Sequence, residues 1–166
     1  MFRTRTLFER DKYRVVKAHS HDAPIFSALI KSDWSERVAI SARRHNVNPT
    51  QIAEELRRGG GLVLMRHNVP VAALAYVPRR DGSWELRRLG VRRSFSGRGF
   101  TTFLLSTLED LARESGVHSI RVPVDAHSPQ HQDYFSRLGF SVDSDRTLST
   151  VFASAMQPVL MRKLIL

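Results

Sequence analysis

The spacing of hydrophobic and polar positions changes along the chain. After a short β-rich run at Tyr13–Ala18, apolar residues recur at helical spacing up to about residue 58. Further on, between residues 62 and 91, they form extended runs separated by turn residues. The pattern therefore predicts a mostly helical first third followed by a β-sheet.

Three helices are expected in the first third. Asp22-Ala23-Pro24 supplies an N-cap and a first-turn proline, and Ile25, Phe26, Leu29 and Ile30 follow at helical spacing. A second amphipathic stretch covers roughly Ser35–Arg44. A third helix is expected from Asn48-Pro49 to Arg58, where three successive glycines end it.

The remainder predicts strands alternating with two helices. Leu62–Met65, Val69–Val77 and Ser83–Val91 predict a meander, in which Pro70 favours an edge or strand-start position. The most regular helix is expected at Phe100–Ser115, and a second helix at Pro129–Leu138. Further strands are expected at 119–124, 140–142 and 159–166. This order predicts a single domain of the α/β class.

Composition narrows the classes of protein. With 166 residues and 42% hydrophobic residues the chain is expected to fold as one globular domain, and the absence of cysteine excludes disulfides and thiolate nucleophiles. Val69–Pro78, the longest apolar run, is too short to span a membrane, and a cytoplasmic location is expected. Residues 61–100 carry eight arginines against two acids. This charge fits either a phosphorylated or polyanionic ligand or a solvated basic face.

The segment Leu89–Leu105 carries the candidate chemistry. A predicted strand runs into a loop containing Gly97, Arg98 and Gly99, and that loop opens the most regular helix. Free amide groups and the dipole at a helix start attract anions, and glycines let a phosphate approach the backbone. Two glycines at this spacing are also compatible with a simple turn.

In its order of motifs, the chain from about Leu62 to the C-terminus resembles the GNAT superfamily of N-acetyltransferases. The loop Ser96–Thr101 after Leu89–Val91, the run Tyr134–Phe140 (YFSRLGF) and the closing Met161–Leu164 carry the resemblance. It implies a mixed central β-sheet flanked by helices (α+β) in one domain over residues 1–166. A helical acceptor-side region would span about 20–60 and a coenzyme-binding core about 61–166. It also implies acetyl transfer from acetyl-CoA (coenzyme A) to a primary amine by direct attack in a ternary complex, without a metal.

The resemblance also implies a set of coenzyme contacts. Leu89 and Val91 would bind the pantetheine and polarise the thioester through backbone N–H groups, and Ser128 would contact the pantetheine arm. Ser96 and Thr101 depart from the family pattern, in which these positions are Gln or Arg and Gly or Ala. The full set is Leu89, Gly90, Val91, Ser96, Gly97, Arg98, Gly99, Phe100, Thr101, Thr102, Ser128 and Phe135.

An acid and a base are needed for amine acetylation. Glu85 stands where several family members place a base; strand alternation would put it on one face with Leu89 and Val91, although a salt-bridged carboxylate is the alternative. Where the family often has an acidic Tyr, the chain has Phe135. Tyr134 is the remaining candidate acid; it lies about 100° further round the helix and is expected to point elsewhere. His127 and His131 lack metal-ligand spacing.

Two alternative functions remain open. A catalytically degenerate module that binds acyl-CoA or a partner is suggested by Ser96, Thr101 and Phe135. A helix-turn-helix DNA-binding protein is suggested by residues 48–58, although a glycine run and an extended segment follow instead of a second helix. The acceptor would be a protein amine, an aminoacyl group on RNA or a small amine, and like-charge repulsion disfavours polyamines. Binding of nucleic acid and the oligomeric state are left open.

Overall fold

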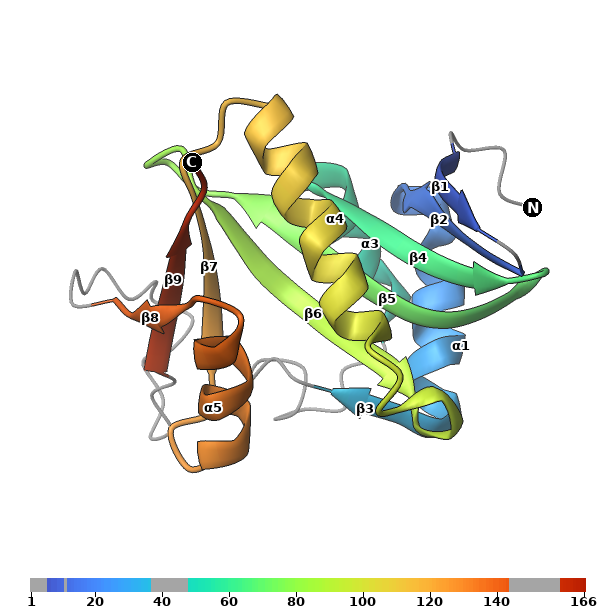
Figure 1. Cartoon of the computed structure of the whole chain (residues 1–166). Coiled ribbons are helices and arrows are strands. Elements are labelled where there is room, and N and C mark those ends of the chain that lie inside the picture. The colour runs from blue at the N-terminus through green and yellow to red at the C-terminus, as the bar shows by residue number, and fades with distance from the viewer. Residues whose placement is uncertain (1–5, 11, 37–47, 144–158) are drawn as a thin grey trace.

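A computed structural model describes residues 6–10, 12–36, 48–143 and 159–166. Within these residues one sheet is formed in the order β1-β2-β4-β5-β6-β7-β9-β8, with β3 also paired to β6 (Figure 1). The strands are β1 (Thr6–Arg10), β2 (Tyr13–Ala18), β3 (Trp34–Glu36), β4 (Gly60–Arg66), β5 (Val69–Pro78), β6 (Trp84–Arg92), β7 (Ser119–Val124), β8 (Ser141–Val142) and β9 (Val159–Leu164).

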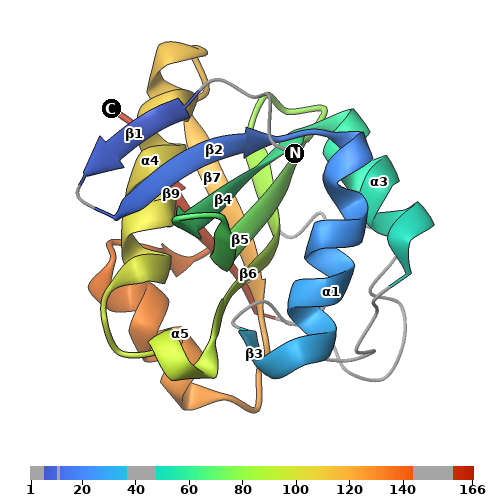
Figure 2. The ribbon, with the colours of Figure 1, turned by 90° about the vertical axis from the view of Figure 1, so that its right-hand side faces the viewer.

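Helices cover both faces of this sheet, as Figure 2 shows from the side. One face carries α1 (Ala23–Asp33) and α3 (Pro49–Arg58), which pack Phe26, Leu29 and Ile52 against Val63 and other sheet residues. The opposite face carries α4 (Phe100–Glu114) and α5 (Pro129–Arg137), and this side holds the larger core. The two short 3-10 helices are η1 (Ser20–Asp22) and η2 (Arg93–Phe95).

The sequence of α4 explains its place at the centre of one face. Leu104, Leu105, Leu108 and Ala112 are buried, so the helix turns one continuous apolar stripe to the sheet. On the other face, α3 begins as predicted at Asn48, whose Oδ1 accepts a hydrogen bond from the Thr50 N–H at 2.9 Å. Such an N-cap stabilises a helix by about 1 kcal/mol.

Most of the predicted elements are confirmed within a residue or two, with two differences. The predicted amphipathic stretch Ser35–Arg44 is wrong at its start, where Trp34–Glu36 forms strand β3; the rest lies outside the described residues. Strand β1 was not predicted at all. Pro70 lies at the start of a strand, as predicted: it is the second residue of β5, where the register with β4 shifts.

The helix-turn-helix alternative is not supported by the fold. After α3 the chain enters β4 at Gly60 instead of a second helix. β4 is a central strand, paired with β2 on one side and β5 on the other. Residues 48–58 are therefore one helix packed on a sheet rather than half of a DNA-reading motif.

Strand β6 has two features that shape the site. Its pairing with β5 shifts register so that Tyr76 pairs with Leu86 and Ala75 with Arg88, which leaves Arg87 as an extra residue. Its parallel pairing with β7 is confined to Trp84↔Ile120 and Glu85↔Arg121, after which the two strands diverge (Figure 1). Strand β3 then pairs with Gly90–Arg92 at the other end of β6.

Candidate active site

The loop between β6 and α4 has the backbone geometry of an anion site. Gly97 and Gly99 have φ values of 76° and 78°, in the left-handed region that favours glycine. Ser96, Gly97, Arg98 and Gly99 are exposed. The first turn of α4 contains no acidic residue and receives no side-chain cap from Gly99. The backbone N–H groups of this turn therefore have no side-chain cap from Gly99, and the positive end of the helix dipole lies at the exposed loop.

Three hydroxyl groups meet beside this helix start. The Tyr134 Oη lies 2.9 Å from Thr101 Oγ1 and 3.1 Å from Thr102 Oγ1, and thereby links α5 to the first turn of α4. Tyr134 thus turns its hydroxyl to the predicted coenzyme loop at the start of α4. Its role as an acid stays a prediction.

Phe135 is a core residue instead of a surface for the coenzyme. Its side chain is 0% exposed and packs edge to face against Tyr134 and Phe140, with ring centroids 5.1 and 5.5 Å apart. A ring enclosed in this way has no surface for a ligand contact. The predicted coenzyme contact at Phe135 is therefore not supported by the geometry.

The extra residue in β6 separates Glu85 from Leu89 and Val91. Leu86, Leu89 and Val91 belong to the core beneath α4, whereas Arg88 on the other face contacts Glu55 of α3. Glu85 lies on the α3 face with Arg88, so the prediction that it shares a face with Leu89 and Val91 is wrong. Strict alternation fails because the bulge reverses the side-chain direction.

Glu85 is buried, with 1% exposure, and is held by two arginines. Its Oε2 contacts Arg79 Nη1, and its Oε1 lies 3.2 Å from Arg87 Nε. Two guanidinium groups stabilise the ionised carboxylate. The structure thus places Glu85 on the side of α1 and α3, in ion pairs, and its role as a base stays a prediction.

A second set of ion pairs, centred on the buried Arg121, adjoins Glu85 and was not predicted. Arg121, which pairs in register with Glu85, lies 2.9 Å from Asp81 and 3.3 Å from Asp143. Burial raises the pKa of Asp81, but hydrogen bonds from the Ser83 hydroxyl and amide and the charges of Arg121 and Arg79 outweigh it and lower the pKa below its usual value. We call Arg79, Asp81, Glu85, Arg87, Arg121 and Asp143 the arginine–acid network.

The predicted pantetheine contacts lie on an edge of β6 that is partly occupied. Strand β3 pairs with it in the register Glu36↔Gly90, Ser35↔Val91 and Trp34↔Arg92. Of the three predicted contacts on β6, Gly90 and Val91 lie in the stretch that pairs with β3. Leu89 lies just before it, in the stretch where β6 and β7 have diverged. An extended ligand on the whole edge would compete with β3 for backbone groups.

The remaining predicted residues lie at the same end of the sheet. Phe100, which begins α4, is half-buried, and Ser128 is the N-cap of α5. Because β6 and β7 are parallel, the segments that follow them begin at the same edge of the sheet. The segment after β6 contains the glycine loop, and the segment after β7 contains Ser128. Within the described part of the chain no group of three His, Asp or Glu side chains could hold a metal ion. None of the described helices is long and apolar enough to cross a membrane.

Comparisons with known proteins agree with this geometry. Residues 25–140 match the model of the acetyltransferase (GNAT) family. A search of curated proteins found no match.

Three solved structures illustrate the similarity in fold. An IAA acetyltransferase from Bacillus cereus is 14% identical, with a TM-score of 0.68 over 92% of this chain and 99% of that one. A PaiA N-acetyltransferase from Thermoplasma acidophilum, in complex with coenzyme A, is 12% identical, with a TM-score of 0.68 over 93% of this chain and 99% of that one. N-acetylglutamate synthase from Neisseria gonorrhoeae, complexed with coenzyme A and N-acetyl-glutamate, is 16% identical, with a TM-score of 0.73 over 95% of this chain and 36% of that one.

Proposed function

Because the chain belongs to the acetyltransferase (GNAT) family, we propose that it transfers the acetyl group of acetyl-CoA to a primary amine by direct attack in a ternary complex. The fold and enzyme class expected from the sequence are confirmed by this membership. The expected donor agrees with the coenzyme A present in two of the similar structures. The observation that carries the proposal is the glycine loop that opens α4, at the end of β6 that lies away from its short pairing with β7.

The donor would enter on the side of α4 and α5. Its pyrophosphate would accept hydrogen bonds from the amides at the start of α4, and the exposed Arg98 would add positive charge. Thr101 stands where the family pattern has a small residue, and the Tyr134 hydroxyl lies within hydrogen-bond distance of the hydroxyls of both Thr101 and Thr102. They can donate to phosphate oxygens, so the departure at Thr101 is compatible with binding.

The chemistry requires a polarised carbonyl and two proton movements. The amine nitrogen bonds to the thioester carbon, the carbon–sulfur bond breaks, the amine proton passes to a base and the thiolate takes a proton from an acid. Backbone N–H groups near Leu89 would stabilise the charge on the carbonyl oxygen. In this proposal the base is Glu85, and the acid is Tyr134, whose hydroxyl lies on the donor side.

The acceptor would approach from the side of α1 and α3, the face to which Glu85 is turned. Arg58 is exposed at the end of α3, as is Arg57, which pairs with Glu54 at 2.6 Å. The positive charge that remains there favours an acidic acceptor. A protein amine or an aminoacyl group on RNA fits this charge better than a polyamine does.

The burial of Glu85 favours a second candidate function. A module that binds acyl-CoA without turnover would not need an accessible base. It would bind acetyl-CoA tightly and release no free coenzyme A in the presence of any amine.

One experiment separates these candidates. The protein is incubated with labelled acetyl-CoA and a panel of acidic peptides, aminoacyl-RNA and small amines, and both label transfer and coenzyme binding are measured. We expect transfer to at least one amine. Coenzyme binding without transfer would favour the second candidate, and no coenzyme binding would eliminate both.

The acid and base assignments need their own variants. In Glu85→Gln we expect the rate to fall about 100-fold and to lose its dependence on the ionisation of a base, with unchanged coenzyme affinity. In Tyr134→Phe we expect a smaller fall, about tenfold, in the rate at saturating acetyl-CoA. Full activity in a well-folded Glu85→Gln variant would leave Glu85 a structural carboxylate.

A further inference from the structure

Arginine and aromatic side chains gather beside the glycine loop. The Arg66 guanidinium carbon lies 5.8 Å from the centroid of the Phe95 ring, and that of Arg98 lies 5.2 Å from it. Phe95 also packs near Phe100, 6.3 Å between centroids, and Phe100 lies 4.9 Å from Tyr13. We call these five residues the arginine–aromatic cluster. The sequence placed only Arg98 and Phe100, which belong to the loop, in a common site.

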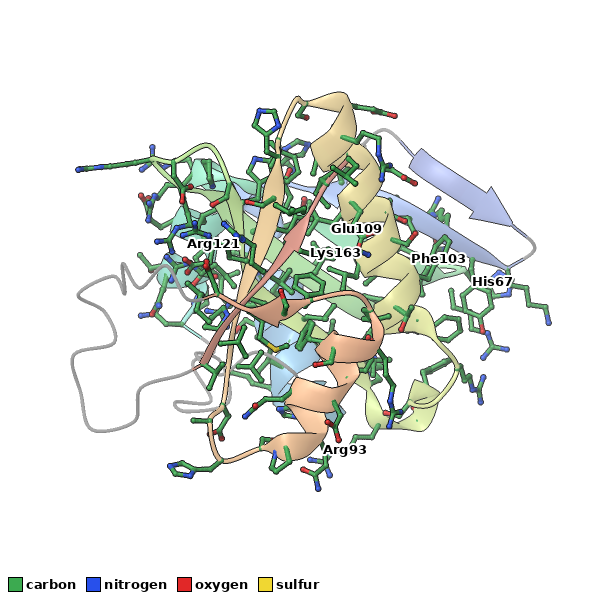
Figure 3. All side chains as sticks on the ribbon, turned by 60° about the vertical axis from the view of Figure 1, so that its left-hand side comes forward. His67, Arg93, Phe103, Glu109, Arg121 and Lys163 are labelled. Carbon is green, nitrogen blue, oxygen red and sulfur yellow. The ribbon has the colours of Figure 1, made fainter. Side chains whose placement is uncertain are left out.

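The cluster joins distant segments at one end of the sheet. Arg66 ends β4 and is paired in register with Tyr13 of β2, while Phe95 belongs to η2, directly before Ser96. His67 and Phe103, labelled in Figure 3, mark the same end of the molecule, across from Arg121. The cluster therefore adjoins the loop proposed to hold the pyrophosphate, on the side of β2 and β4.

The two arginines of the cluster keep donor groups available. A guanidinium that lies over an aromatic ring uses its face, and the N–H groups in its plane can still bind an anion. Arg66 Nε is shielded from water and has no hydrogen-bond partner in the described part of the chain. Among the ion pairs found between described residues, none includes Arg66 or Arg98.

We propose that the arginine–aromatic cluster binds the 3′-phosphoadenosine end of coenzyme A, an inference that rests on the proposed function. This end combines a flat base with a phosphate monoester. The base stacks on aromatic rings and guanidinium planes, and the phosphate accepts bidentate hydrogen bonds from two guanidinium groups. A ligand with its pyrophosphate on the glycine loop places both groups next to Phe95. The arginines at this end then distinguish coenzyme A from a nucleotide that lacks the 3′-phosphate.

The test compares the affinities of coenzyme A and dephospho-coenzyme A, which lacks only the 3′-phosphate, by titration calorimetry. We expect the intact protein to bind coenzyme A at least tenfold more tightly, and Arg66→Ala to reduce this ratio by about tenfold. Arg80→Ala is the matched control, since it removes an exposed arginine at the opposite end of β5 and β6 and should leave the ratio unchanged. Arg66→Lys, which keeps the charge without the fork, should give an intermediate ratio and serves if the alanine variant does not fold.

Each result has a distinct meaning. Equal affinities for the two ligands in the intact protein, with coenzyme binding preserved, would overturn the inference and leave the proposed function standing. Absence of binding to both ligands would overturn the proposed function itself. If a single-stranded RNA oligonucleotide bound in an Arg66-dependent way while the two coenzymes bound equally, the cluster would be a nucleic-acid site and the inference would be wrong.

Discussion

The two ends of β6 use arginine in opposite ways. Where β6 begins, the arginine–acid network sets three arginines against three carboxylates, and Arg121 and Glu85 are buried. Where β6 ends, the arginine–aromatic cluster sets Arg66 and Arg98 against rings. Apart from the proposed role of Glu85 as a base, charges that neutralise one another serve the fold, whereas arginines held on rings keep their N–H donors for a ligand. The net charge of the chain does not reveal this division; the partners of each arginine do.

The largest expected effect concerns the arginine–acid network, at the start of β6. Arg121→Ala would leave Asp143, whose side chain is 1% exposed, without its arginine, and we expect a loss of about 3–5 kcal/mol in the free energy of unfolding. Urea denaturation measures this change. The control Arg113→Ala removes an exposed pair with Asp110 and should cost less than about 1 kcal/mol. A loss below 1 kcal/mol in Arg121→Ala would show that the network is not structural.

The second prediction concerns the loop at the other end. Gly99→Ala places a Cβ on a residue with φ of 78° and should cost about 1–2 kcal/mol in stability. Gly116→Ala, at φ of 72° beyond the far end of α4, is matched in strain and has equally open surroundings. We expect both variants to lose similar stability but only Gly99→Ala to lose coenzyme affinity, by about tenfold. Equal affinities in the two variants would remove the loop from the coenzyme site.

The sequence predicted much of the sheet and both helices on the donor side, α4 and α5, because hydrophobic periodicity and helix caps are local signals. It failed where one residue changes the geometry. The extra residue at Arg87 reverses the direction of Glu85, and nothing in a count of alternating positions reveals a bulge. The short strand β3 was missed because three residues carry no measurable period.

Side-chain partners across distant segments were also beyond prediction. Arg66 and Phe95 lie 29 positions apart, and only the fold brings them together. The hydroxyl contacts of Tyr134 with Thr101 and Thr102 depend on where α4 lies relative to α5, and the helical angle of Tyr134 alone does not give that position. Phe135 could have been recognised as core from its residue type, since phenylalanine is among the residues most often fully buried.

The smallest expected effect is a pH dependence of stability that comes from Asp81 in the arginine–acid network. The pKa of Asp81 is lowered in the folded protein, so its ion pair stabilises the fold above the unfolded value of about 4 and is lost as the pH falls through the folded value. Because the Asp81 side chain is 42% exposed, solvent screens the pair, and Asp81→Asn should cost less than about 1 kcal/mol at pH 7. The difference in urea midpoint between Asp81→Asn and the intact protein should be largest at pH 7 and should shrink as the pH falls through the lowered pKa of Asp81. A difference that does not change with pH would mean that Asp81 acts through packing rather than through its charge.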